Sequence, residues 1–269
     1  MRAGVLVTGG AKRVGRAIAE ALSADGWFVC IHYNGSGAAA AALVEDLRRA
    51  GGRAVALQAD LADVAATEAL VERAAAAAGG LDALVNNASL FENDDLASMT
   101  ADTWERNMAV NLRAPALLSR DFARALPPER RGCIVNLVDQ KLWNLNPDFL
   151  SYTVAKAGLH ALTEMLAMTL APRIRACGIA PGLLLPSGKM TRETFERVHG
   201  RTPLGFGPTV AEIVAAVRLI LATPSLTGQT LIIDGGESLQ RRLKDVQFEE
   251  AAWETSRDED AAAGPADGR

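Results

Sequence analysis

The chain has 269 residues, of which 49% are hydrophobic, and a formal net charge of −4 at pH 7. This length suits one α/β domain with a large core, and the negative charge gives no electrostatic basis for binding nucleic acid or an anionic membrane. Aromatic residues are only 5% of the chain, too few for a base-stacking platform. No basic leader precedes an apolar run and no run is long enough to span a bilayer, so we expect a cytoplasmic protein outside the membrane.

Three cysteines lie far apart, each in an apolar run: Cys30, Cys133 and Cys177. Cysteines in such runs are most often reduced core residues of a cytosolic chain. The three histidines lack the spacing of metal ligands, so no metal is expected.

Apolar strand-like runs alternate with helical patterns along the chain. Strands are predicted at 4–8, 27–32, 53–57, 82–86, 132–138, 174–180 and 230–233. Helices are predicted at 14–24, 38–50, 64–78, 102–126, 151–171 and 209–222. This alternation predicts a doubly wound α/β (Rossmann) fold in a single domain, whose seven-stranded parallel sheet has helices on both faces. Ligands should bind at the carboxyl ends of the strands.

The first predicted strand ends in Gly9 and Gly10 and continues through Lys12, Arg13 and Val14 into a helix. A strand, a glycine turn and a helix place backbone N–H groups and a helix N-terminus against a phosphate. A glycine turn can also be simple chain punctuation. At the head of a chain with six further strand-like runs, it predicts a dinucleotide site.

The end of the second predicted strand indicates which nicotinamide cofactor is used. Folds specific for NAD place an acidic residue there, which accepts from the ribose 2′-hydroxyl. Residues 31–37 contain no acid, whereas Lys12 and Arg13 add two cations to the nearby turn and Ser36 adds a hydroxyl. Because cations and a hydroxyl suit a 2′-phosphate, the sequence predicts NADPH. Arg13 can also clamp the pyrophosphate or a neighbouring loop.

Two segments fall outside the predicted core, which extends over residues 1–238. Residues 183–202 carry Pro186, Gly188 and Phe195, and we interpret them as a loop that covers the substrate. Residues 239–269 begin basic and turn acidic. This tail is either a frayed, solvated end or a segment that docks through Phe248 and Trp253 on its own or a neighbouring subunit.

Tyr152 and Lys156 stand four residues apart in an apolar-periodic stretch, so both project from one face of one helix. An ammonium beside a phenol stabilises the phenolate that forms when the phenol gives up its proton. Since an ordinary tyrosine has a pKa of about 10, Tyr152 waits protonated as a general acid. The alternative is a surface charge beside a core aromatic residue.

Motifs in a specific order and spacing make the chain, over roughly residues 3–238, resemble the short-chain dehydrogenase/reductases. These motifs are Thr8–Gly9, Asp60–Leu61, Asn86–Asn87–Ala88, Asn111, Tyr152 with Lys156, Pro181–Gly182 and Asp234–Gly235–Gly236. The resemblance implies a nicotinamide cofactor and a homotetramer. It also implies that Asn111 supports a water leading to Lys156.

Within that family the chain is similar to the pteridine reductases. Arg13 replaces the usual third glycine of the turn, and Asp139 occupies the position of the usual catalytic serine. Phe91 follows Asn-Asn-Ala-Ser by two residues, and Phe195 corresponds to an aromatic residue over the substrate. The resemblance implies cofactor contacts from Gly9, Lys12, Arg13, Val14, His32, Tyr33, Asn34, Ser36, Asp60, Leu61, Asn87, Ala88, Ser89, Tyr152, Lys156, Pro181 and Gly182. It implies substrate contacts from Arg13, Ser89, Phe91, Asp139, Tyr152 and Phe195.

Asp139 favours a pterin as substrate. An ionised carboxylate only accepts hydrogen bonds and would repel the oxyanion that develops when a ketone is reduced. A pterin offers N–H donors, and one of its ring nitrogens must receive a proton, which Asp139 can relay from Tyr152. Asp139 could instead be a residue that only caps a loop, and Phe91 could belong to the core.

Two other functions are possible for the whole protein. One is a carbonyl reductase that tolerates Asp139. The other is a nicotinamide-binding regulator without turnover, but such a regulator would not need Tyr152, Lys156 and Asn111.

Overall fold

The computed structural model describes residues 4–186 and 190–248. Seven parallel strands form one sheet in the order β3-β2-β1-β4-β5-β6-β7. The strands are β1 (Gly4–Val7), β2 (Phe28–Tyr33), β3 (Arg53–Gln58), β4 (Leu81–Asn86), β5 (Gly132–Leu137), β6 (Ile174–Pro181) and β7 (Thr230–Ile233). Every predicted strand is confirmed to within one residue at each end.

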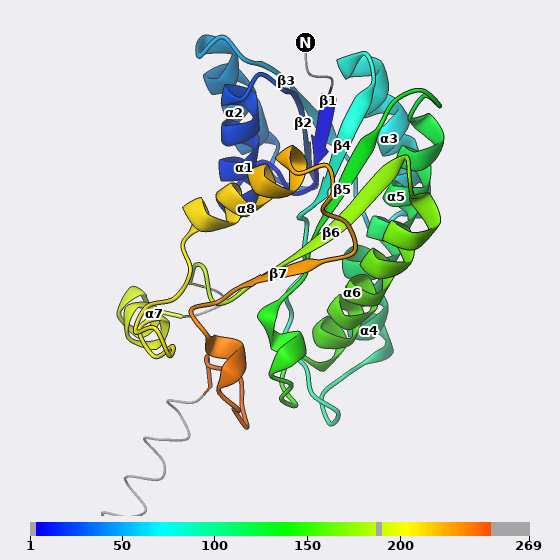
Figure 1. The fold of residues 1–269 in the computed structure, drawn as a ribbon. Helices are drawn as coiled ribbons and strands as arrows, with labels where there is room; N and C mark the ends of the chain where they lie inside the picture. Colours follow the sequence, from blue (N-terminus) through cyan, green and yellow to red (C-terminus); the bar gives the residue numbers. More distant parts are fainter. Residues whose placement is uncertain (1–3, 187–189, 249–269) are drawn as a thin grey trace, which may run out of the picture.

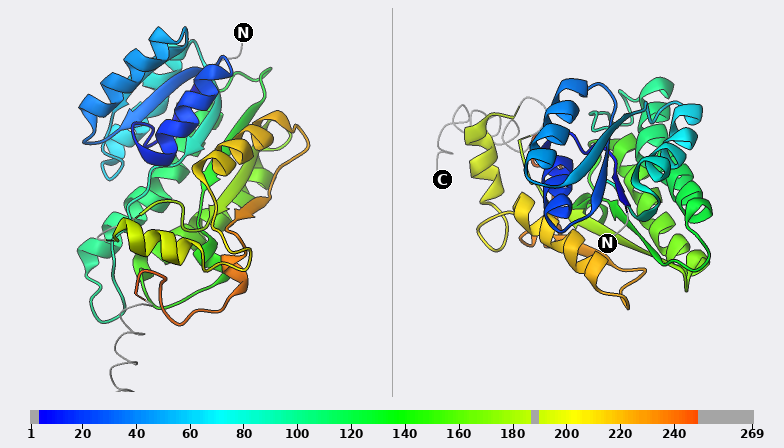
Figure 2. Two further views of the ribbon diagram at one scale, coloured as in Figure 1. Left: turned by 90° about the vertical axis from the view of Figure 1, so that its left-hand side faces the viewer. Right: turned by 90° about the horizontal axis from the view of Figure 1, so that it is seen from above.

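Helices cover both faces of the sheet (Figure 1). On one face lie α1 (Arg13–Ala24), α2 (Gly37–Arg49) and α8 (Val210–Ala222). On the other lie α3 (Val64–Ala78), α5 (Ala114–Ala125) and α6 (Leu150–Leu170). Figure 2 shows, from above, the sheet between these two layers. Each layer packs its apolar stripe on continuous apolar strands and forms one of two large buried clusters, which confirms the doubly wound single-domain fold.

The prediction of one helix over 102–126 is wrong. The structure has α4 (Ala101–Met108), then a π-helical segment η1 (Ala109–Arg113), and then α5. Pro115 stands at the start of α5 and has no N–H to donate to the carbonyl of residue 111. The missing bond and the steric demand of the proline ring explain why the regular α-helix is interrupted just before it. Such π segments are frequent at functional sites, and this one carries Asn111.

The segment between β6 and α8 contains the short helix α7 (Arg192–His199), which stands off the sheet in Figures 1 and 2. The Thr191 side chain caps α7 by accepting from the N–H of Thr194. Two 3₁₀ turns lie at the carboxyl edge of the sheet, η2 (Gln140–Trp143) after β5 and η3 (Glu237–Leu239) after β7.

Residues 240–248, here called the C-terminal segment, pack along the same edge. The prediction of a frayed end is wrong for this part of the tail, because apolar and charged anchors hold it. Val246 is buried, and the Phe248 ring lies parallel to that of Phe149 with the centroids 5.8 Å apart. The docking of Phe248 on its own chain is thus confirmed, whereas Trp253 lies outside the described residues.

Candidate active site

Two cavities adjoin at the carboxyl ends of the strands. The turn cavity, of about 470 Å³, lies beside Gly9, His32 and Asp60, at the ends of β1, β2 and β3. The Tyr152 cavity, of about 420 Å³, lies beside the ends of β5 and β6 and the first turns of α6. Both are lined by Arg13, Val14, Asn87 and Ser89. The two cavities therefore form one elongated site.

Glycine is required at two places in the turn after β1. Gly9 has φ +62°, which disfavours any side chain. A Cβ on Gly15 would stand 2.2 Å from the Gly9 carbonyl oxygen, so α1 could not approach the turn. The end of β4 fastens the turn from the other side, because Asn87 Nδ2 donates to the Thr8 carbonyl at 2.8 Å. The backbone at the head of α1 is thus fixed, with room beside it for a phosphate.

His32 holds the turn as a neutral side chain. Its Nδ1 accepts from the N–H of Gly9 at 3.1 Å, and its Nε2 donates to the Ala59 carbonyl at 3.1 Å. Burial lowers the pKa of His32 to about 4. His32 lines the turn cavity without supplying a positive charge.

Most of the other predicted cofactor residues line one of the two cavities: Lys12, Asn34, Asp60, Leu61 and Ala88 line the turn cavity, and Pro181 and Gly182 line the Tyr152 cavity. Two do not. Tyr33 packs against the core beneath α1 and α2, and Ser36 precedes α2. In this structure neither reaches a cavity wall.

Arg13 joins the turn to the segment after β6. It is one of two non-glycine residues in the described chain with positive φ, at +52°. Its guanidinium donates to the Pro186 carbonyl at 3.0 Å. Arg13 therefore stands where the two cavities meet and bridges their walls.

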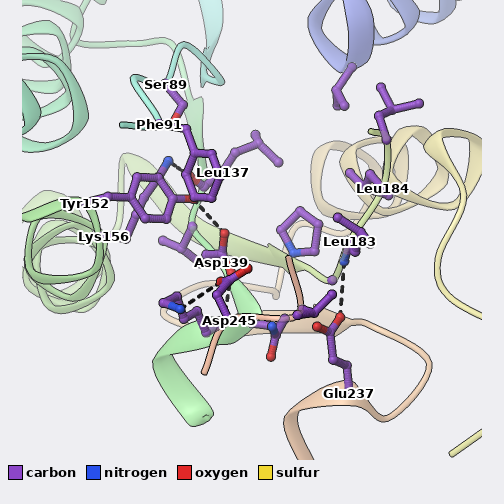
Figure 3. A pocket seen from close by; sticks show the side chains of 18 of the residues that line it. Ser89, Phe91, Leu137, Asp139, Tyr152, Lys156, Leu183, Leu184, Glu237 and Asp245 are labelled. Carbon is purple, nitrogen blue, oxygen red and sulfur yellow. Dashed lines mark hydrogen bonds and ion pairs between the residues drawn. The ribbon is translucent and has the colours of Figure 1, made fainter. Parts of the chain in front are cut away.

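Asp139, Tyr152 and Lys156 come together in the Tyr152 cavity (Figure 3). The Tyr152 hydroxyl donates to Asp139 Oδ2 at 2.6 Å. The other carboxylate oxygen, Oδ1, accepts from the N–H of Lys141 at 2.8 Å. Lys156 Nζ donates to the Leu137 carbonyl at 2.7 Å and lies 5.7 Å from the centre of the Tyr152 ring. The carboxylate is thus held in place by a backbone bond while it contacts the phenol.

Burial sets the proton affinities of this group. It raises the pKa of the Asp139 carboxyl, although the bond from Tyr152 opposes the rise. Burial and the charge of Asp139 raise the pKa of Tyr152 well above its ordinary value. Burial lowers the pKa of Lys156 to about 8. At neutral pH Tyr152 is therefore a phenol that carries its proton.

Asn111 is fully buried in η1 and holds the loop after β4. Its Nδ2 donates to the Leu90 carbonyl at 2.9 Å and to Asn107 Oδ1 at 3.1 Å. Its Oδ1 accepts from Ser89 Oγ and from the N–H of Leu90, each at 3.0 Å. Asn111 lines neither cavity of the described chain. Its visible role is to position Ser89, while the water leading to Lys156 stays a prediction.

An aromatic stack forms one side of the Tyr152 cavity. The Phe91 ring lies parallel to that of Phe149 at 4.1 Å and edge-on to that of Tyr152 at 4.7 Å. Phe91 is 37% exposed and lines the cavity, so the core interpretation does not hold for it. Phe195 is placed elsewhere. It contacts His199 one turn later on α7, and the structure does not bring it to either cavity.

Sequence reasoning missed several charged residues of the cavity. Lys141 Nζ donates to Asp245 Oδ2 at 2.8 Å, and both side chains are buried. No local pattern could have revealed this pair, because its members are 104 residues apart. Glu237 also lines the cavity. It directly follows the motif Asp234–Gly236 and could have been found by asking what comes after that turn.

Residues 4–186 and 190–248 contain no group of three or more His, Cys, Asp or Glu side chains that could hold a metal ion. No helix among them is both long and apolar enough to cross a membrane.

Comparisons with known proteins agree with this arrangement. Pteridine reductase 1 of Leishmania tarentolae is 34% identical in an alignment that covers 88% of this chain and 96% of that protein. The 3-oxoacyl-[acyl-carrier-protein] reductase FabG of Staphylococcus aureus is 30% identical over 88% of this chain and 98% of its own. FolM alternative dihydrofolate reductase 1 from Brucella canis, solved in complex with NADP, superposes with a TM-score of 0.84 and 42% identity, covering 88% of this chain and 95% of that one. The family model of the short chain dehydrogenases matches residues 3–198, and the chain belongs to this family.

Proposed function

We propose that this protein is an NADPH-dependent reductase that transfers hydride to a dihydropterin-type substrate. The observation that carries the proposal is the 2.6 Å hydrogen bond from the Tyr152 hydroxyl to Asp139 on the wall of the Tyr152 cavity. It pairs a proton donor with a carboxylate, whose negative charge would repel the oxyanion that develops when a ketone is reduced.

NADPH is the cofactor because the turn cavity suits its 2′-phosphate. Lys12, Arg13 and Asn34 line this cavity, and β2 ends without a carboxylate to repel the phosphate. Relatives solved with NADP or NADPH support the assignment. The cofactor supplies the hydride, and Pro181 and Gly182 line the cavity into which the hydride must be delivered.

Tyr152, Lys156 and Asp139 handle the proton. Reduction of a C=N bond adds hydride to carbon and a proton to the adjacent nitrogen. Tyr152 gives its proton to the Asp139 carboxylate, Asp139 passes that proton on to the ring nitrogen, and the positive charge of Lys156 stabilises the phenolate that remains. The ring lies against Phe91, whose face suits a flat bicyclic substrate. Arg13 and Ser89, on the shared wall, complete the substrate contacts.

Two of the relatives are named for the reduction of pteridine and of dihydrofolate, and pterins and dihydrofolate share the pteridine ring system. A carbonyl reductase is the second candidate. It is favoured by the similarity to FabG and by the Tyr152–Lys156 pair, which would serve a ketone equally well. A regulator without turnover would have no need of a proton donor.

The experiment is to follow NADPH absorbance with 7,8-dihydrobiopterin and 7,8-dihydromonapterin, and then with a panel of ketones. Rapid oxidation of NADPH with a dihydropterin and little with ketones is the expected result. Turnover of ketones alone would make the protein a carbonyl reductase, and no turnover with any substrate would favour the regulator.

The proposal includes three further points. Within segment 183–202, Leu183, Leu184 and Leu185 cover the substrate, because they line the Tyr152 cavity, while Gly188 lies outside the described residues. The protein is a homotetramer, because α6 exposes Met165 and Met168, and α8 and β7 expose further apolar residues, Leu219 and Ile232. Its location is cytoplasmic, which is supported by three buried, free cysteines.

A further inference from the structure

Glu237 is a buried carboxylate in the wall of the Tyr152 cavity, with an exposed fraction of 3%. The turn before it fixes its position. Asp234 accepts from the N–H groups of Gly236 and Ser238, at 2.8 and 2.7 Å. Gly236 has φ +87°, which leads the chain directly into η3. Glu237 is therefore a rigid feature of the cavity.

One oxygen of Glu237 is engaged. Its Oε2 accepts from the N–H of Leu183 at 3.2 Å. A Cβ on Gly182 would stand 2.8 Å from this oxygen, so the glycine makes room for the carboxylate. The other oxygen, Oε1, accepts no hydrogen bond from a residue of the described chain. Glu237 thus keeps acceptor capacity for a ligand.

The other charged groups of the cavity are already partnered. Lys141 pairs with Asp245, Asp139 accepts from Tyr152, and Lys156 donates to a backbone carbonyl. Burial raises the pKa of Glu237 to about 7, while the N–H of Leu183 and the charge of Arg242 oppose the rise and the like charges of Asp139 and Asp245 add to it. A ligand that donates hydrogen bonds to this buried carboxylate therefore binds with a favourable free energy, because it satisfies an acceptor that would otherwise lack a partner.

We propose that Glu237 is a second substrate-binding carboxylate, which accepts from the N–H donor edge of the substrate while Asp139 and Tyr152 serve the reacting edge. In Figure 3 Glu237 and Tyr152 lie on opposite sides of Asp139. The aminopyrimidine ring of a pterin carries an amino group next to a ring N–H, and one carboxylate can accept from both. The inference rests on the proposed function and makes Glu237 a determinant of specificity, since a ligand without donors would leave this carboxylate unsatisfied.

Glu237→Gln is the variant that tests this, because its amide oxygen can still accept from Leu183 while the negative charge and the second acceptor are gone. KM for 7,8-dihydrobiopterin should rise about 10-fold or more, with kcat and the KM for NADPH nearly unchanged. KM of the wild type should rise as the pH falls through 7 and Glu237 takes up a proton, and this rise should be absent in the variant. Glu72→Gln, which removes the same charge from an exposed position on α3, is the matched control.

A binding measurement separates this inference from the proposed reaction. Calorimetry should show that Glu237→Gln weakens the binding of a 2,4-diaminopteridine to the NADP⁺-loaded protein. The loss of affinity should be at least as large as the expected rise in KM for 7,8-dihydrobiopterin, about 10-fold or more. Affinity for 9,10-phenanthrenequinone, a flat ligand without donors, should not fall. If the wild type reduces no pterin but the diaminopteridine result holds, the donor subsite stands and the reaction is wrong.

If pterins are reduced and Glu237→Gln behaves like the wild type, Glu237 is not a substrate ligand and the proposed function stands. Equal losses for all ligands, NADPH included, would mean that Glu237 only positions residues 182–186, which also overturns the inference.

Discussion

The hydroxyl of Tyr152 lies 2.6 Å from Oδ2 of Asp139 and donates to it. Asp139 follows β5, and Tyr152 is in the first turn of α6, so the connection through η2 brings the two together. The bond holds one proton between the phenol oxygen and a carboxyl oxygen, and burial raises the pKa of both groups. This relationship distinguishes the site from one with a serine at the same position, because a serine hydroxyl could donate to a substrate oxygen whereas this carboxylate accepts.

Cofactor preference can be measured directly. We expect kcat/KM to favour NADPH over NADH about 10-fold or more, which corresponds to about 1.4 kcal/mol, because the turn cavity offers Lys12 and Arg13 and β2 ends without an acid. Asn34→Asp should erode the preference by repelling the 2′-phosphate, and Asn34→Ala is the neutral control. Comparable efficiencies with the two cofactors in the wild type would contradict the assignment.

The assembly prediction concerns the exposed apolar face of α6. Met165 and Met168 are 59% and 73% exposed in the monomer, which points to a covering partner. Light scattering should give about four times the 28.4 kDa mass of the chain. Replacing both methionines by glutamate should reduce the mass of the assembly measured by light scattering. A wild type with the mass of a monomer would refute the tetramer.

His32 should make stability depend on pH. Burial lowers its pKa from 6.5 to about 4, so the unfolded chain takes up this proton before the folded one. The contribution of His32 to the free energy of unfolding is fully present above pH 6.5. It is lost as the pH falls towards 4, and the loss amounts to up to about 3 kcal/mol. Urea unfolding at pH 7 and pH 5 should show a smaller loss in His32→Gln than in the wild type. The same loss in both would show that His32 is not the cause.

The buried pair of Lys141 and Asp245 should anchor the C-terminal segment. Lys141→Met leaves Asp245 buried without its cation and should lower the free energy of unfolding by about 3–5 kcal/mol. Lys141→Met/Asp245→Asn removes both charges and should recover much of that loss in urea unfolding. If the double variant is no more stable than the single one, the pair is not coupled as the 2.8 Å contact indicates.

The sheet could be predicted from sequence because its strands are buried on both faces and read as continuous apolar runs, as in Cys133–Leu137. Tyr152 and Lys156 could be found because they share one helix face. The interruption before Pro115 was also open to prediction, since a proline cannot continue the hydrogen-bond ladder. Asp139 was recognisable by its position relative to Tyr152.

Other parts of the site had no local signal. The tail has the composition of a solvated end, yet Asp245 and Val246 line the Tyr152 cavity. The reason is a contact with a residue far away in the sequence, the ion pair of Asp245 with Lys141, which composition does not reveal. Phe149 adopts φ +57°, and nothing in its neighbours indicates that it would lie beneath Phe91. Phe195 was expected over the substrate, but α7 pairs it with His199 instead.

The most direct test of the pterin assignment compares the wild type with three variants in NADPH oxidation. Asp139→Asn and Tyr152→Phe should each reduce turnover with 7,8-dihydrobiopterin roughly 10²–10⁴-fold. The double variant should lose far less than the product of the two, because the residues act as one relay. Asp139→Ser should stay poor with the dihydropterin. A serine variant that gains ketone reduction, from a wild type inert towards every pterin tried, would contradict the account.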